Sequence, residues 1–379
     1  MALAAALQRF IDWFWGASFP IWAERGWDAK GGFFESLDNS GRPIVGAPRR
    51  VRVQARQVYV FTTAARLDRH AGAGRVSDLG FDYFVVRACP EAGARGCLHA
   101  LNPDGTALDT RRDLYDQAFL ILAAASRVRR SGDPRALGLA RGAIDFIDRE
   151  LKAPAGGYLE DDVGSKPRRQ NPHMHLFEAM LALAEATGDD TFLGRARQLK
   201  RLFDMRFFDR RELVLREFFD DPMSAPDPRL GDIIEPGHMM EWVCLLDRYA
   251  ALTGEPVADM QRLLYVRAQE IGRDSAGFLV DRLRLGSAPA GPRRLWPQTE
   301  YLRASLVTAR LGLDGAGDAA ARLIEALFAS YLHQPVNGLW CDQYDGEGRS
   351  VAASVPASIV YHLMEAALEA EVHLKGVKV

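Results

Sequence analysis

Gly31-Gly32-Phe33-Phe34-Glu35, near the start of the chain, is the first of six similar segments that decide the fold. The other five are Gly96-Cys97-Leu98-His99, Gly156-Gly157-Tyr158-Leu159-Glu160, Leu213-Val214-Leu215-Arg216, Gly277-Phe278-Leu279-Val280-Asp281 and Gly338-Leu339-Trp340-Cys341-Asp342. These short, hairpin-like segments recur roughly every 60 residues, and such a period is typical of repeat architectures. Units of strand, helix and helix predict about twelve helices in a ring of inner and outer helices. The strands and the functional site should lie at one end.

Helix signals fill the intervals between these segments. We expect helices over residues 4–15, 51–67, 115–128, 136–147, 171–186, 191–207, 237–252, 256–271, 296–311, 319–331 and 356–374. Asn171 before Pro172 is a favourable helix cap. Similar turns, each with a glycine helix stop, separate helix pairs at Ser131-Gly132-Asp133, Thr187-Gly188-Asp189 and Thr253-Gly254-Glu255. We expect short strands near residues 32–38, 157–161 and 339–344, and a single domain over residues 1–379.

Composition is ordinary for a globular protein with a sizeable core. The 379 residues are 48% hydrophobic and 26% charged, with a net charge of −2. This balance requires neither a nucleic acid nor an anionic membrane as a partner. No apolar run reaches the roughly 18 residues of a membrane-spanning helix. The apolar N-terminus lacks the basic residues of a signal peptide, so we expect a soluble cytoplasmic protein.

Metal-binding patterns are absent from the sequence. The cysteines, Cys89, Cys97, Cys244 and Cys341, lack zinc-ligand spacing and are interpreted as buried reduced thiols. His173 and His175 would point about 200° apart on a helix, so they are poorly placed to bind one ion. Of this pair we expect only His175 to face the site. We therefore predict no metal and no cofactor.

The richest segment is Ile234-Glu235-Pro236-Gly237-His238-Met239-Met240-Glu241-Trp242. Pro236 and Gly237 should start a helix, which places His238 in its first turn, where backbone N–H groups are unpaired. Glu241 and Trp242 would share its face. A histidine, a carboxylate and an aromatic ring suit a sugar, although His238 could instead cap its own helix.

Polar residues recur at two distances from the start of each segment. Arg56, His238 and His362 form one set, and Tyr115, His175 and Trp296 form the other. If the repeat is real, each set lies at one level of the ring and faces one pocket; the alternative is coincidence. Arg56 could hold an oxyanion, or it could be a buried ion pair.

Together these segments resemble the N-acylglucosamine 2-epimerase family over nearly the whole chain. The resemblance is carried by Gln54-Ala55-Arg56-Gln57, Asp113-Leu114-Tyr115-Asp116, Asn171 with Met174-His175 and Glu178, Glu235-Pro236-Gly237-His238 with Glu241-Trp242, and Trp296-Pro297-Gln298-Thr299-Glu300. It implies an all-α (α/α)6 barrel and metal-free proton transfer at sugar C2 by His238 and His362, with Arg56 and a further site histidine at His175. Thr299 departs from the small apolar residue frequent in relatives, which leaves the substrate open.

We expect Glu241 to assist catalysis, and a larger set to bind substrate: Tyr115, Asn171, His175, Trp242, Trp296, Gln298 and Glu300. Two histidines can move a C2 proton through a cis-enediol. Return of the proton to C1 gives a ketose, and its return to the other face of C2 gives an epimer. A mannose–fructose type isomerase is narrowly preferred over an N-acylglucosamine or aldose 2-epimerase.

Two other classes of function remain open. An inverting glycoside hydrolase could use a pair of carboxylates from among Glu235, Glu241, Asp116 and Glu300. A non-catalytic sugar-binding protein is the second, because a fold does not guarantee activity. Exchange of the C2 proton with deuterium distinguishes both from an isomerase. The expected partner is a small sugar, and a homodimer is possible.

Overall fold

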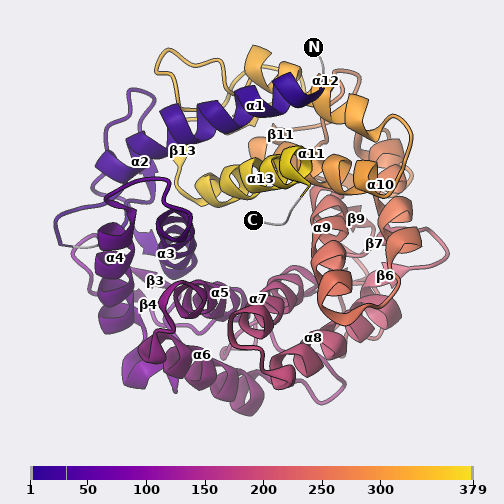
Figure 1. The fold of residues 1–379 in the computed structure, drawn as a ribbon. Helices are drawn as coiled ribbons and strands as arrows, with labels where there is room; N and C mark the ends of the chain where they lie inside the picture. The colour runs from indigo at the N-terminus through magenta and orange to yellow at the C-terminus, as the bar shows by residue number, and fades with distance from the viewer. Residues whose placement is uncertain (1–2, 31, 377–379) are drawn as a thin grey trace.

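Long helices alternate between an inner and an outer ring (Figure 1). The inner helices are α3 (Val51–Arg66), α5 (Leu114–Ser131), α7 (Asn171–Thr187), α9 (Pro236–Thr253), α11 (Leu295–Arg310) and α13 (Ser358–Lys375). The outer helices are α1 (Leu3–Trp13), α2 (Phe19–Arg25), α4 (Ala73–Ala88), α6 (Pro134–Phe146), α8 (Asp190–Leu202), α10 (Ala258–Gly272) and α12 (Ala316–Ala329). This is the predicted (α/α)6 barrel.

The computed structural model describes residues 3–30 and 32–376. Gly31, with which the first repeated segment begins, and both ends of the predicted 1–379 unit lie outside the described residues. Short turns of other helix types complete the fold, at Phe14–Ser18, Pro90–Gly93, Ile147–Leu151 and Phe203–Phe207. Three of them extend the outer helices α1, α6 and α8.

Burial explains which helices form the inner ring. In α11 the residues from Leu295 to Thr308 are buried on every face. In the outer helix α8 only a stripe is buried, made of Phe192, Leu193, Ala196 and Leu199. A helix that is apolar on one stripe covers a core, whereas one buried all round lies within it.

Two helices, α2 and α4, were not predicted from the sequence, and α4 is the longer one. Gly74 and Gly80 lower its helix propensity, as do the β-branched residues Val85 and Val86. Tertiary packing requires the glycine: a Cβ at Gly80 would lie 2.2 Å from the ring of Phe33, which belongs to the first repeated segment. Packing between α4 and this segment therefore overrides local propensity.

The predicted glycine turns are confirmed at the ends of α5, α7 and α9. Gly132, Gly188 and Gly254 each adopt the left-handed conformation at the helix end. The prediction for Asn171 is wrong, because its side chain makes no capping bond. Asn171 is the first residue of α7, and its side chain faces a cavity instead.

The strands are very short and join neighbouring units. They are β1 (Ser36–Leu37), β2 (Arg49–Arg50), β3 (Ala100–Leu101), β4 (Ala107–Asp109), β5 (Arg168–Arg169), β6 (Phe208–Asp209), β7 (Val214–Leu215), β8 (Phe218–Phe219), β9 (Ile233–Ile234), β10 (Leu283–Arg284), β11 (Arg293–Arg294), β12 (Gln343–Tyr344) and β13 (Val355–Pro356). The expected hairpins within a unit occur, among the described strands, only as β3–β4 and β6–β7. Most strands pair with the next unit, and β13 pairs with β1, which joins the last unit to the first.

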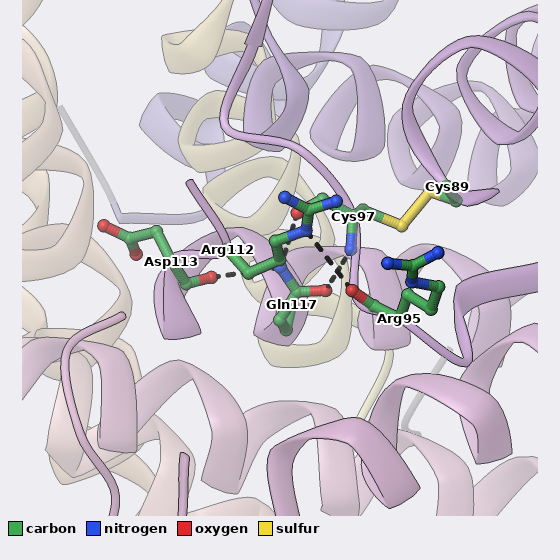
Figure 2. Close-up of a disulfide and its surroundings, with 6 residues drawn as sticks. All are labelled: Cys89, Arg95, Cys97, Arg112, Asp113 and Gln117. Atoms are coloured by element: carbon green, nitrogen blue, oxygen red, sulfur yellow. Dashed lines mark hydrogen bonds between the residues drawn. A yellow bond between two sulfur atoms is a disulfide. The ribbon is translucent and has the colours of Figure 1, made fainter. Parts of the chain in front are cut away.

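A disulfide replaces two of the four expected thiols. Cys89, at the end of α4, is bonded to Cys97 of the second repeated segment (Figure 2). The two segments meet because Leu98 N–H donates to the carbonyl of Ala88, and Gln117 of α5 binds both the N–H and the carbonyl of Cys97. The spacing of the two cysteines in the sequence did not show that the chain folds back and brings Cys97 beside Cys89. Cys244 and Cys341 are free and buried, as expected.

None of the helices in residues 3–30 and 32–376 combines the length and the apolar character that crossing a membrane requires.

Candidate active site

A cavity of about 350 Å³ opens at the N-terminal ends of the inner helices. Predicted site residues that line it are Arg56, Tyr115, Asn171, His175, His238, Glu241, Trp296 and His362. They come from all six inner helices. A second cavity, of about 310 Å³, lies toward the opposite ends of these helices, where the charged walls largely pair with one another and no histidine is present among the lining residues. The first cavity is therefore the candidate site.

Three predicted binding residues do not line this cavity. Trp242 is fully buried in the core, where its ring packs 4.3 Å from that of Phe203 and its indole N–H donates to Gln170. It lies one helical turn deeper than His238 and is directed toward α7 and its neighbours. Gln298 binds the backbone N–H and carbonyl of Leu279, so its role is structural. Glu300 lies behind His362.

Backbone bonds between units reveal which site residues are truly equivalent. The N–H groups of Val51, Leu114, Gln170, Leu295 and Ala357 each donate to a carbonyl of the following unit. Counting five residues onward from Val51, Gln170 and Ala357 gives Arg56, His175 and His362.

His238 belongs to a different level. In the fourth unit the strand register makes Glu235 the residue equivalent to Val51, so His238 corresponds to Gln54. Gln54, Gln117 and Gln298 each clamp the backbone of a repeated segment. The predicted equivalence of His238 with Arg56 and His362 is therefore wrong, as is that of His175 with Tyr115 and Trp296, although all of these side chains line one cavity.

His238 is bonded to a carboxylate that the sequence analysis did not identify. Its Nδ1 lies 3.0 Å from Glu217 Oε2 and 3.6 Å from Glu235 Oε2. Burial alone would lower the pKa of His238, but the charge and hydrogen bond of Glu217, together with the charge of Glu235, raise this pKa to about 9. His238 therefore carries a proton at neutral pH.

His362 has the opposite protonation state. Burial, together with the positive charges of Arg56 and Arg303, lowers its pKa well below the ordinary value. Its Nδ1 is 2.8 Å from Glu300 Oε1, and Arg303 Nη1 is 2.6 Å from the other oxygen of Glu300. Nδ1 therefore donates to Glu300, which leaves Nε2 with a free lone pair.

Glu241 is a neutral acid in this arrangement. Burial and the nearby charge of Glu300 raise its pKa well above the ordinary value. Glu300 is bonded to Arg303 and to His362, so the proton that these two carboxyl groups compete for is held by Glu241. Glu241 can thus donate a hydrogen bond to a sugar hydroxyl.

Arg56 supplies positive charge to the cavity wall. Its guanidinium donates to the Tyr115 hydroxyl at 2.8 Å and lies 4.1 Å from the ring centre of Phe119. Within the described residues no carboxylate pairs with it, and its Nε has no hydrogen-bond partner. This argues against the alternative of a buried ion pair.

Trp296 and His175 complete the site. The Trp296 ring lies 5.1 Å from that of His238 and 5.7 Å from that of His362, so it is adjacent to both imidazoles. His175 binds Glu178 through Nδ1 at 3.0 Å. His173 is turned away from the cavity, where it accepts a bond from Tyr158 N–H.

One set of side chains at the site could hold a metal ion. Glu241, Glu300 and His362 each offer a ligand atom, and these atoms lie within 4.8 Å of one another. Glu300 is already engaged by Arg303 and His362, and Glu241 holds a proton, so a metal would have to displace both interactions.

Sequence reasoning missed the buried carboxylates that control the imidazoles. Glu217 lies 21 residues before His238, in an apolar strand region without a local pattern. Glu178 was noted as part of the family resemblance and Glu300 as a residue that would bind substrate, but neither was predicted to bond to a histidine. A glutamate in an otherwise apolar segment is itself a signal, because buried carboxylates are rare unless paired.

The sequence matches known proteins over almost its whole length. The sequence profile described as N-acylglucosamine 2-epimerase (GlcNAc 2-epimerase) matches residues 32–366. A mannose-6-phosphate isomerase of Rhizobium meliloti (strain 1021) is 36% identical over 381 residues, which cover 96% of each chain. A D-mannose isomerase of Thermobifida fusca is 26% identical over 364 residues, covering 90% of this chain and 86% of the relative.

A solved structure agrees with the fold. The cellobiose 2-epimerase of Spirochaeta thermophila DSM 6192 superimposes with a TM-score of 0.87 and 22% identity, over 99% of this chain and 98% of that one. The profile match and the 36% identical relative show which family the chain belongs to. Membership of that family supports a sugar isomerase or epimerase activity at C2. The chain belongs to the N-acylglucosamine 2-epimerase family.

Proposed function

We propose that this enzyme is an aldose–ketose isomerase that acts on C1 and C2 of a mannose-type sugar. The observation that carries the proposal is the opposite protonation of two histidines around one cavity, with His238 charged and His362 neutral. Such a pair provides a general acid and a general base at the same pH. The two relatives named as mannose or mannose-6-phosphate isomerases favour isomerisation over epimerisation.

In the proposed reaction the substrate is the open-chain aldose. His362 Nε2 removes the proton from C2 while His238 donates a proton to the carbonyl oxygen at C1, which gives the cis-enediol. His362 then returns its proton to C1, and the hydroxyl at C2 gives its proton back to His238, which leaves a ketose. Arg56, which pairs with no carboxylate of the described residues, stabilises negative charge that develops on the oxygens.

Other cavity residues hold the sugar. Trp296 offers a flat surface beside both imidazoles, and the neutral Glu241 donates to a hydroxyl. Asn171, whose Oδ1 has no partner, accepts from another hydroxyl. His175 and Tyr115 form the wall beside Arg56.

Product analysis by NMR in deuterated water tests this function. Incubation with mannose and with mannose 6-phosphate should yield a ketose that contains deuterium at C1. Interconversion of two aldoses without a ketose would instead make the enzyme a 2-epimerase, the second candidate. If neither sugar incorporates deuterium at C1 or C2, the protein is instead a glycoside hydrolase or a non-catalytic sugar-binding protein.

A further inference from the structure

Two arginines line the outer part of the active-site cavity. The side chains of Arg50 and Arg294 are 39% and 34% exposed, whereas those of His238 and His362 are each 6% exposed. All four line the same cavity. The arginines therefore lie at its mouth, and the histidines lie at its base.

Both arginines are held rigidly by acids that do not line the cavity. The backbone N–H and Nε of Arg294 both donate to Asp281, and those of Arg50 both donate to Glu35. Among the described residues this leaves both terminal nitrogens of Arg294, and one of Arg50, without an acceptor. Such a guanidinium is oriented in advance and keeps free donors for a ligand.

The cavity lining contains more cationic than anionic side chains. Arg56 has no carboxylate partner in the part of the chain that the structure describes, and the carboxylate that pairs with Arg52 is Asp116, which lies outside the lining. Of the acids that do line the cavity, Glu241 is neutral and Glu235 lies beside His238 and Arg282. Asp342, whose Oδ1 has no partner, is the remaining one. A neutral sugar does not require this excess of cations.

We propose that Arg50 and Arg294 form a phosphate subsite, and that the substrate class is a terminally phosphorylated aldohexose. The planar fork of a guanidinium matches two phosphate oxygens. The sugar then extends from the mouth to the base of the cavity, with its phosphate between the arginines and its C1–C2 edge at the histidines. Ser358, which also lines the cavity, supplies a further hydroxyl. This inference rests on the proposed function.

A neighbouring cavity of about 500 Å³ is a weaker candidate for the phosphate. It shares Arg52 and Tyr115 with the active site, and Arg111, Lys166 and Arg169 also line it. Three acids line it as well, namely Asp113, Glu160 and Asp161. Neither His238 nor His362 lines this second cavity, whereas both line the cavity that has Arg50 and Arg294 at its mouth, so that mouth is favoured.

The test compares mannose 6-phosphate with mannose as substrates. The wild-type enzyme should have a kcat/KM at least about 100-fold higher for the phosphorylated sugar, because each charge-assisted pair contributes roughly ten-fold or more. Arg294→Gln and Arg50→Gln should each reduce this preference by about ten-fold to 100-fold. Inorganic phosphate should compete with mannose 6-phosphate in the wild-type enzyme and compete less well in both variants.

Arg169→Gln is the matched control. Arg169 is bonded to Glu160 through its N–H and Nε in the same manner, and its side chain is 36% exposed, but it does not line the active-site cavity. Its loss should leave the preference unchanged. A wild-type enzyme that converts both sugars equally well would overturn the subsite, as would equal losses in all three variants. Failure to form a ketose from either sugar would refute the proposed function itself.

Discussion

At the scale of single residues, two chemically identical imidazoles acquire different roles from their neighbours. His238 and His362 are equally buried, so burial lowers the pKa of both. Around His238 the charges of Glu217 and Glu235 outweigh that effect. Around His362 the cations Arg56 and Arg303 reinforce it. Charge placement, and not exposure, therefore separates the pKa values of the proposed acid and the proposed base.

Removal of either imidazole should abolish most turnover. His238→Ala and His362→Ala should each lower kcat by about 10²–10⁴-fold, since each supplies one proton-transfer step. His373→Ala, in the last turn of α13 and outside the cavity lining, is the control and should lose little activity. The measurement is steady-state kinetics with circular dichroism to confirm folding. Near-full activity in either of the first two variants would contradict the assignment.

The activity should depend on pH through His238. Because its pKa is raised to about 9, the acid form is present below that pH and is lost as the pH rises through it. The rate should therefore fall on the alkaline side near pH 9. The ion pair with Glu217 also stabilises the fold, and that contribution is complete below the unfolded pKa of about 6.5 and is lost as pH rises through about 9.

Glu217→Gln should move the alkaline fall in rate to lower pH. The substitution removes the charge that raises the pKa of His238 and keeps the shape of the side chain. A pH–rate profile of kcat gives the result, with the exposed Glu347→Gln as the control. If kcat of Glu217→Gln falls at the same alkaline pH as that of the wild-type enzyme, Glu217 is not the group that raises the pKa of His238.

Activity should survive exhaustive chelation. The proposed proton transfer uses only side chains, and the one set of possible ligands at the site, Glu241, Glu300 and His362, is already engaged in hydrogen bonds or protonated. Dialysis against a chelator followed by assay measures this. Loss of activity that a divalent ion restores would show that the two-histidine scheme is wrong.

At the scale of elements, glycines at helix ends and in helix interiors should respond oppositely to alanine. Gly188 ends α7 with a φ of +68°, which an L side chain adopts only with strain, so Gly188→Ala should destabilise the protein by roughly 1 kcal/mol. Gly194 lies inside α8 with open space around it, so Gly194→Ala should stabilise it by roughly 0.5–1 kcal/mol. Urea denaturation measures both, and effects of the same sign would contradict the argument.

Elements with local signals could be predicted from the sequence, and those determined by distant contacts could not. Glycine turns such as Gly188 were recognisable because the conformational reason is local. Helix α4 was not, because Gly80 is explained only by Phe33, which belongs to another element. The same division applies to the site: His238 and His362 were predicted to face one cavity and both line it, while Glu217 was missed and Trp242 was placed wrongly in the cavity.

At the scale of the whole molecule, closure of the ring ties every unit to two neighbours. Strand β13 pairs with β1, and α13 packs against both α11 and α3, so the last unit contacts the first as it contacts the fifth. The active site lies on the ring axis and takes side chains from all six inner helices. The proposed catalysis therefore requires the closed ring, because Arg56 on α3 and His238 on α9 lie on opposite sides of it.

Neither half of the barrel should fold alone. Division at Gly188 yields one fragment with the inner helices α3, α5 and α7, and another with α9, α11 and α13. Each fragment would expose inner-helix faces that are buried in the intact ring, such as those of Met174 and Met239. Expressed separately, both fragments should lack a cooperative thermal transition by calorimetry, and the sugar isomerase or epimerase activity should return only if they reassemble. A cooperative transition in either fragment would instead divide the chain into two independent domains.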